Sequence, residues 1–179
     1  ISGLVGSEMC IRDRSRKVVR EAHAKIDSFL KYGDHVARPL QRELRNIMWE
    51  NCGVVRDENK LMEGLKKVER LKESSKSLDV RPDSEGYEDL MLAFDLEGAI
   101  MSAEATILGA KARKESRGSH QRSDYIETSK AHELNYVIKL DENKLLKIEP
   151  EELCPLKEEL KSLIESTDDI NDFEGMLLE

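Results

Sequence analysis

A stretch near the middle of the chain, residues 85–116, carries the longest helical pattern in the sequence. Its apolar residues recur at spacings of three and four along two lines, which is the periodicity of an α-helix with two apolar sides. The first line contains Leu92, Leu96, Ile100, Ala103, Ile107 and Ala110, and the second contains Met91, Phe94, Met101, Ala105, Leu108 and Ala112. Because such a helix needs neighbours on both sides, the pattern predicts the central helix of a bundle.

Three amphipathic segments precede this helix. The first is expected over 15–32, the second has Pro39 in its first turn, and Asp57 is expected to cap the third. In the second segment, Trp49 is the only large aromatic residue and is expected to be the aromatic anchor of the bundle. The apolar faces of the second and third segments contain Leu40, Leu44, Ile47, Met48, Leu61, Leu65, Val68 and Leu71.

The period changes after the central helix. Apolar and polar residues alternate over 134–140, and a turn signal at 141–143 leads to a second short run at 144–148. This pattern predicts a β-hairpin that lies at the periphery of the bundle, since it has one apolar face and follows the core. A short helix over 156–164 and a mobile acidic tail from Asp168 are expected to follow.

These segments divide the chain into four parts. They are residues 1–14, a helical bundle domain at 15–125, a loop and hairpin at 126–150, and a short helix with its tail at 151–179. The chain begins with Ile, and residues 5–14, VGSEMCIRDR, resemble the translated read-through of a sequencing adapter. Residues 1–14 are therefore predicted to be an artefact or disordered, and the natural protein is expected to continue upstream.

Composition limits the classes of function. The 179 residues are 37% charged and carry a formal charge of −8, which argues against general affinity for nucleic acid or anionic membranes. No apolar run is long enough to span a bilayer. Cys10, Cys52 and Cys154 are few and widely spaced, so neither a disulfide framework nor a zinc site is indicated, and a reducing compartment fits best.

A basic segment follows the central helix at residues 113–125, RKESRGSHQRSDY, which we call the motif turn. Cations in the last helical turn and a left-handed Gly118 at the helix end are ordinary features of a helix C-terminus. The cations beyond that end are not explained in this way. We therefore expect a docking surface for carboxylates, in which Arg117 and Arg122 are solvated in this chain alone. The candidate docking residues are Arg113, Glu115, Ser116, Arg117, Gly118, His120, Arg122 and Asp124.

Two blocks of the sequence resemble a known family. They are residues 45–57, RNIMWENCGVVRD, and residues 114–125, KESRGSHQRSDY. Both are similar to the C-terminal helical domain of succinate dehydrogenase and fumarate reductase flavoprotein subunits, which L-aspartate oxidase shares. The resemblance covers about 15–148 and implies a mainly α fold, a three-helix, spectrin-repeat-like bundle that packs on a FAD domain. Residues 126–130 depart from the family pattern, and 149–179 have no counterpart.

The resemblance also implies where the chemistry lies. In the family, FAD and the substrate-binding residues belong to upstream domains, and this chain has no G-x-G-x-x-G after a strand. No catalytic, cofactor-binding or metal residue is therefore expected here, and the chain alone is predicted to be inactive. The implied partners are its own upstream FAD domain and an iron-sulfur subunit, with no nucleic acid and no membrane insertion. The implied location is the cytoplasm, at the membrane face through partner subunits.

The sequence leaves three alternative functions open. The hairpin favours the succinate and fumarate enzymes, but the chain could instead be the C-terminal domain of L-aspartate oxidase. From another class, it could be a free-standing helical adaptor whose basic turn binds an acidic partner. A hydrolase using Ser119, His120 and Asp124 is a third possibility, although the three residues are crowded into one loop.

Overall fold

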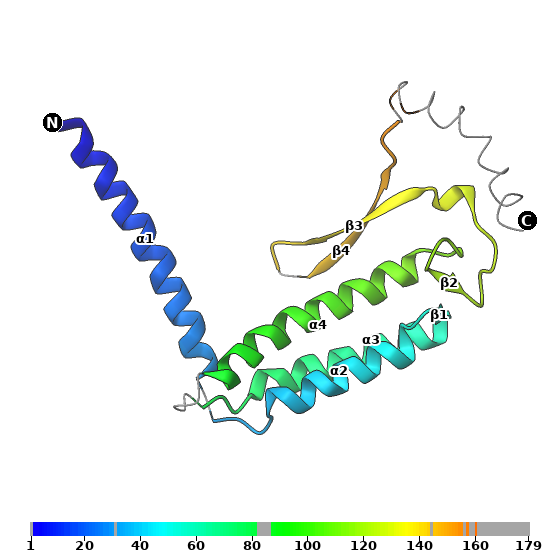
Figure 1. Cartoon of the computed structure of the whole chain (residues 1–179), viewed down its shortest axis with the longest axis horizontal. Coiled ribbons are helices and arrows are strands. Elements are labelled where there is room, and N and C mark those ends of the chain that lie inside the picture. The colour runs from blue at the N-terminus through cyan, green and yellow to red at the C-terminus, as the bar shows by residue number, and fades with distance from the viewer. Residues whose placement is uncertain are drawn as a thin grey trace, which may run out of the picture.

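A computed structural model of the chain describes residues 2–30, 32–81, 87–143, 145–155, 157 and 160. Helices α2, α3 and α4 lie side by side as a bundle, α1 projects from one end of it, and a β-hairpin lies over α4 (Figure 1). The predicted fold class, a mainly α three-helix bundle with a C-terminal hairpin, is confirmed. The elements are α1 (Ser2–Phe29), α2 (Ala37–Asn51), β1 (Val55–Arg56), α3 (Glu58–Ser74), η1 (Ser75–Ser77), α4 (Glu88–Ala112), β2 (Gln121–Arg122), η2 (Lys130–His132), β3 (Leu134–Leu140) and β4 (Leu146–Glu152).

One apolar core joins the three bundle helices. Leu61 of α3 and Leu96 and Ile107 of α4 are fully buried in it. The first apolar line of α4 is buried as expected, except that Leu92 is only partly covered. The core also takes in Leu78 and Val80 from the segment between η1 and α4. Its remaining members are Ala37, Leu40, Leu44, Ile47, Cys52, Val68, Leu71, Ala93, Ile100, Ala103 and Ala110.

The second apolar line of α4 is covered only in part. Phe94 packs against Phe29 of α1, with ring centroids 4.7 Å apart, and Ala105 faces the hairpin. Met101, which lies between Phe94 and Ala105 along α4, is exposed, and Met91 near the start of the helix is 64% exposed. The expectation that neighbours cover both sides of this helix is therefore wrong for the two methionines within this chain.

Trp49 is not the anchor of the bundle. Its side chain is 81% exposed, whereas Leu44 and Ile47 on the same helix are buried. Each residue advances about 100° around an α-helix, so Trp49 lies about 200° beyond Ile47, on the opposite face. The large apolar area of Trp49 suggested burial, but its angular position on α2 places the side chain on the face that points away from the core.

Helix α1 differs from the expected first helix. It begins at Ser2 instead of residue 15, and Val18 and Ala22 on its expected apolar face are exposed. Its C-terminal part reaches the bundle, where Lys25 pairs with Glu97 of α4, and Phe29 and the following Leu30 pack against the core. The reason is that the rest of α1 extends away from the other helices (Figure 1). The interpretation of residues 1–14 as adapter sequence stays a prediction.

A side-chain cap and a short backbone pairing tie one end of the bundle together. Asp57 caps α3 as expected, accepting a hydrogen bond from the backbone N–H of Lys60 at 2.9 Å. Immediately before this cap, β1 pairs in parallel with β2, so that Arg56 lies opposite Arg122. This pairing fixes the motif turn beside the connection between α2 and α3.

The predicted hairpin is confirmed. Strands β3 and β4 are antiparallel, with Leu134 opposite Glu152 and Leu140 opposite Leu146. The expected short helix at 156–164 and the acidic tail lie outside the described residues, apart from positions 157 and 160. No helix in the described part of the chain is both long and apolar enough to cross a membrane.

Truncation after Lys130 is expected to leave the bundle folded. No hairpin residue belongs to the core cluster, and the main loss is the pair of hydrogen bonds from Arg113 to the His132 and Leu134 carbonyls. Each hydrogen bond from a charged group contributes about 2 kcal/mol to the free energy of unfolding. Helical circular dichroism and a cooperative melt should therefore persist, with a lower midpoint. Loss of the cooperative transition would show that the hairpin is part of the core.

Candidate functional site

The motif turn folds back on itself just after α4. Arg117 and His120 exchange two backbone hydrogen bonds of 2.9 and 3.0 Å around Gly118, which has a φ of 57°. A left-handed residue at the start of a two-residue turn matches the twist of a tight hairpin, and glycine adopts it at little cost. The sequence-based role of Gly118 as a helix cap is therefore wrong, because α4 already ends at Ala112.

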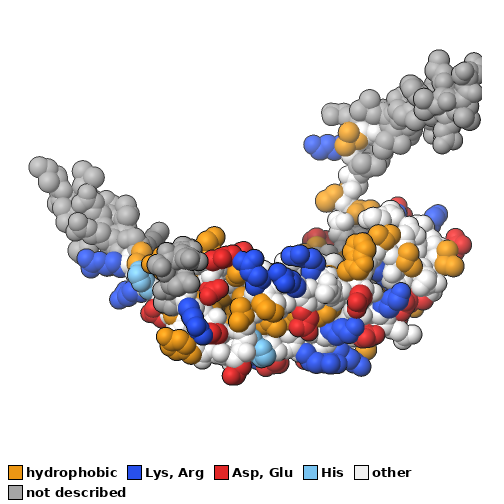
Figure 2. All heavy atoms as spheres, turned by 60° about the horizontal axis from the view of Figure 1, so that its bottom comes forward, with side chains coloured by type: hydrophobic (Ala, Val, Ile, Leu, Met, Phe, Trp, Pro, Cys, Tyr) orange, Lys and Arg blue, Asp and Glu red, His pale blue; other side chains and the backbone are white. Residues whose placement is uncertain are grey.

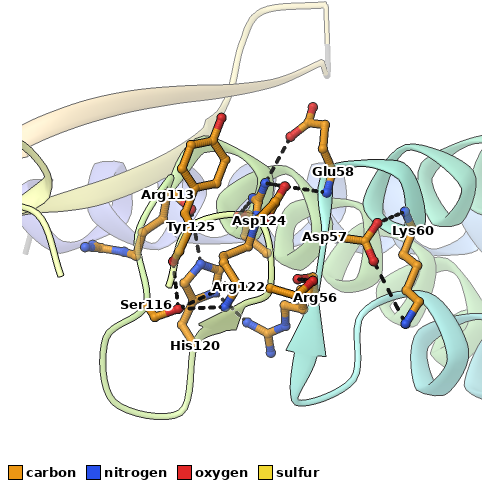
Figure 3. A network of polar contacts seen from close by, with 12 residues as sticks. Arg56, Asp57, Glu58, Lys60, Arg113, Ser116, His120, Arg122, Asp124 and Tyr125 are labelled. Atoms are coloured by element: carbon orange, nitrogen blue, oxygen red, sulfur yellow. Dashed lines mark hydrogen bonds and ion pairs between the residues drawn. The ribbon is translucent and has the colours of Figure 1, made fainter. Parts of the chain in front are cut away.

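Arg122 is the most buried charged group of the turn apart from Glu115, with 1% of its surface exposed. Its Nε and Nη2 atoms each donate to one carboxylate oxygen of Asp124 at 2.7 Å, in a bidentate pair. Nη2 also donates to Glu58 at 3.2 Å, and Nη1 donates to the Ala110 carbonyl at 3.0 Å (Figure 3). The expectation that Arg122 is solvated in this chain is therefore wrong, because these partners all lie within the chain.

Asp124 extends this network to the start of α3. One of its carboxylate oxygens accepts a hydrogen bond from the backbone N–H of Glu58 at 2.9 Å. A carboxylate is stabilised at a helix N-terminus, where unpaired N–H groups carry partial positive charge. The hydrogen bond from Arg122, aided by this backbone contact, lowers the pKa of Asp124 to about 2.

Glu115 is the centre of a second cluster, and its side chain is completely buried. It accepts hydrogen bonds from Arg113 Nη1 at 2.6 Å, from Arg117 Nε at 2.9 Å and from the Ser129 backbone N–H at 2.8 Å. The Arg117 hydrogen bond, against the effect of burial, holds the pKa of Glu115 at about 2. The guanidinium of Arg113 also stacks on Tyr136, 4.8 Å from the ring centroid, and so joins the turn to β3.

Ser116 and His120 complete the turn. The buried Ser116 hydroxyl donates to the Tyr125 carbonyl and accepts from the Arg122 backbone N–H, both at 2.8 Å. His120 Nδ1 accepts from Arg56 at 2.7 Å, so its Nε2–H donates to the Arg113 carbonyl at 3.1 Å. Burial, together with the nearby arginines, lowers the pKa of His120, which favours the neutral ring.

This geometry does not form a hydrolytic triad. Both ring nitrogens of His120 are engaged, and neither contacts Ser119 or Asp124. Asp124 is held by Arg122 instead of orienting a histidine. Within the residues that the structure describes, no three metal-ligating side chains gather into a site. The arrangement acts as a clamp between the end of α4, the start of α3 and the hairpin.

The structure brings together all eight candidate residues of the motif turn but leaves Trp49 outside the network. Sequence reasoning missed two of the partners, Arg56 of β1 and Glu58 of α3. Arg56 lies in the first sequence block that resembles the family, which was a usable signal. Glu58 is an acidic residue in the first turn of a helix and carried no signal of its own.

Comparisons with known proteins show which family the chain resembles. The family model described as "Fumarate reductase flavoprotein C-term" matches residues 41–162. A fumarate reductase (CoM/CoB) subunit of Methanothermobacter marburgensis is 30% identical over 118 residues, which is 65% of this chain and 21% of that protein. L-aspartate oxidase of Pyrococcus horikoshii is 31% identical over 125 residues, covering 70% of this chain and 20% of that protein.

The fold is also found in solved structures. The structure of E. coli quinol fumarate reductase FrdA superimposes with a TM-score of 0.70 at 23% identity, over 79% of this chain and 26% of that chain. This chain spans only about a fifth of the length of the two curated relatives. Since the family match extends over most of the chain, the chain belongs to the C-terminal domain family of the fumarate reductase and succinate dehydrogenase flavoproteins.

Proposed function

We propose that the chain is the C-terminal part of a FAD-dependent oxidoreductase that interconverts succinate and fumarate and passes electrons to an iron-sulfur subunit. In this proposal FAD and the substrate are bound by upstream domains, and the bundle is a non-catalytic docking domain. The family match and the similarity to a fumarate reductase protein support the assignment. Attachment to the cytoplasmic face of a membrane would come through partner subunits.

The observation that carries the docking role is the uncovered apolar surface at one end of the bundle. Trp49, Val54 and Val55 are exposed within seven residues of sequence, where α2 ends and β1 begins. Figure 2 shows apolar side chains among charged ones at the end of the bundle where these elements lie. Exposed apolar patches rimmed by charges are typical of surfaces that bind another protein domain.

The motif turn has a supporting role in this proposal. Its network fixes β2 against β1, and β1 carries Val55 at the edge of the apolar patch. Arg122 and Glu115 therefore hold the docking surface in shape, while Arg117 remains exposed enough to contact a partner.

L-aspartate oxidase remains a second candidate, because the Pyrococcus relative covers 70% of this chain. The hairpin after the motif turn favours the succinate and fumarate enzymes. Assay of the full-length flavoprotein with succinate and with L-aspartate as electron donors separates the two candidates, and oxidation of L-aspartate alone would reverse the preference.

Trp49→Ser is expected to leave the melting temperature of this chain unchanged, because the side chain is already in water. In the full-length flavoprotein, the same substitution should reduce flavin content or the yield of complex with the iron-sulfur partner. The measurement is a pair of thermal melts together with a flavin assay and co-purification. Tyr32→Ser is the control, since Tyr32 is also exposed and follows α1 at the other end of the bundle. Equal losses for both variants in the full-length protein would contradict the docking role.

A further inference from the structure

A groove of about 640 Å³ lies between the C-terminal half of α4 and strand β3. Two arginines and a histidine line it, and its lining contains no aspartate or glutamate, although the chain as a whole carries a charge of −8. The volume is in the range of small-molecule sites. The cationic and aromatic side chains at one end of the groove are Arg56, Arg113, His120 and Tyr136.

Arg56 is the cation at this groove whose charge is not compensated. Its Nε donates to the Gly53 carbonyl at 2.7 Å and its Nη1 donates to His120 Nδ1 at 2.7 Å, so the guanidinium is fixed at two points. Among the described residues, no carboxylate lies within ion-pair distance of Arg56, whereas Arg113 pairs with Glu115. A guanidinium has five N–H donors, so three of those of Arg56 remain for a ligand.

The neighbours of Arg56 reinforce its preference for an anion. Arg113 and Arg117 share the single carboxylate of Glu115, which leaves that cluster with an excess positive charge. His120 accepts from Arg56 through Nδ1, so the ring supplies no negative charge to offset the guanidinium. Figure 3 shows Arg56 of β1 and His120 of the motif turn on the same side of the network, next to Arg122.

Most of the remaining lining of the groove is apolar, with Asn135 and Thr106 as the polar exceptions. Ala105 and Gly109 of α4 face Val137 and Ile138 of β3 across it, and a Cβ added at Gly109 would lie 3.4 Å from the Ile138 side chain. Because Gly109 has no side chain, Ile138 lies close to α4 at this point and forms part of the apolar wall. Thr106 adds a hydroxyl at its wall.

We propose that this groove binds a small organic anion, with a carboxylate head on the Arg56 guanidinium and a short apolar body between α4 and β3. A planar carboxylate matches the free edge of a fixed guanidinium in two parallel hydrogen bonds. The inference does not rest on the proposed function, since it requires neither flavin nor a partner subunit. It concerns a different surface from the apolar patch around Trp49.

The test is a titration of the ¹⁵N-labelled chain with sodium hexanoate and with sodium acetate at constant ionic strength, followed by NMR. Saturable shifts are expected at Gly109 and Ile138, with hexanoate binding at least tenfold tighter than acetate because of its apolar body. Arg56→Gln should weaken hexanoate binding at least tenfold, whereas the exposed Arg81→Gln should not change it.

Two further arms keep the test decisive. If Arg56→Gln loses helical circular dichroism, Thr106→Glu replaces it, because a carboxylate placed at this exposed position of the wall should abolish binding by repulsion. A blocked peptide, N-acetyl-Ala-Glu-Ala-amide, tests whether the carboxylate comes from a protein. The proposal is overturned if hexanoate gives no saturable shift, if neither variant weakens binding, or if the peptide binds more tightly than hexanoate.

Discussion

Arg122→Ala is expected to lower the free energy of unfolding of this chain by about 3 to 5 kcal/mol. The substitution leaves the carboxylate of Asp124 and the Ala110 carbonyl without their guanidinium partner, in a place where Arg122 is almost fully buried. Urea denaturation of the wild type and the variant measures the loss. This result is opposite to the small effect that the sequence alone predicts for a solvated side chain.

Arg38→Ala is the matched control for that experiment. Arg38 also pairs with a carboxylate, that of Glu88, but both side chains are more than half exposed. An exposed pair of this kind contributes about 0 to 1 kcal/mol. Equal losses for Arg122→Ala and Arg38→Ala would show that the buried network does not stabilise the fold.

Glu115→Gln is expected to cost about 3 kcal/mol at pH 7, because Arg113 and Arg117 lose the buried carboxylate that they share. The effect should depend on pH. The pKa of Glu115 is about 2 in the folded chain against an ordinary 4.5, so its stabilisation is complete above about pH 5 and is lost as the pH falls towards 2.

Melting of the wild type and of Glu115→Gln at pH 7, 4 and 3 measures this dependence. The difference between the two proteins should shrink as the pH falls below 4.5, because the unfolded wild type then binds a proton at Glu115 that the folded wild type does not bind. Some acid sensitivity should remain in the variant, because the pKa of Asp124 is also held at about 2. A difference that stays constant from pH 7 to 3 would contradict the assignment of the low pKa to Glu115.

Much of the bundle could be predicted from periodicity alone. The spacing of Leu96, Ile100 and Ile107 predicts the buried face of α4, and an alternation broken at Val137 predicts the first strand of the hairpin. Trp49 shows where residue type misleads, since an aromatic side chain is buried only if its angular position faces the core. The exposure of α1 could not be predicted, because its apolar pattern is the same whether or not another domain covers it.

The motif turn was harder to predict in detail. Its excess of cations is visible in the sequence, but the groups that neutralise them are distant, as Glu58 precedes Arg122 by 64 positions. The parallel pairing of β1 with β2 brings these segments together, and two-residue strands leave no periodic signal. The sequence therefore indicated that the turn binds carboxylates, while the structure shows that several of those carboxylates belong to the chain itself.

The DNA immediately upstream of the codon for Ser15, read from an uncontaminated clone, tests the central claim most directly. If the chain is the docking domain of a flavoprotein, the reading frame should continue upstream and encode a strand followed by a glycine-rich dinucleotide-binding turn. A start codon directly before Ser15, with no open frame beyond it, would contradict the account.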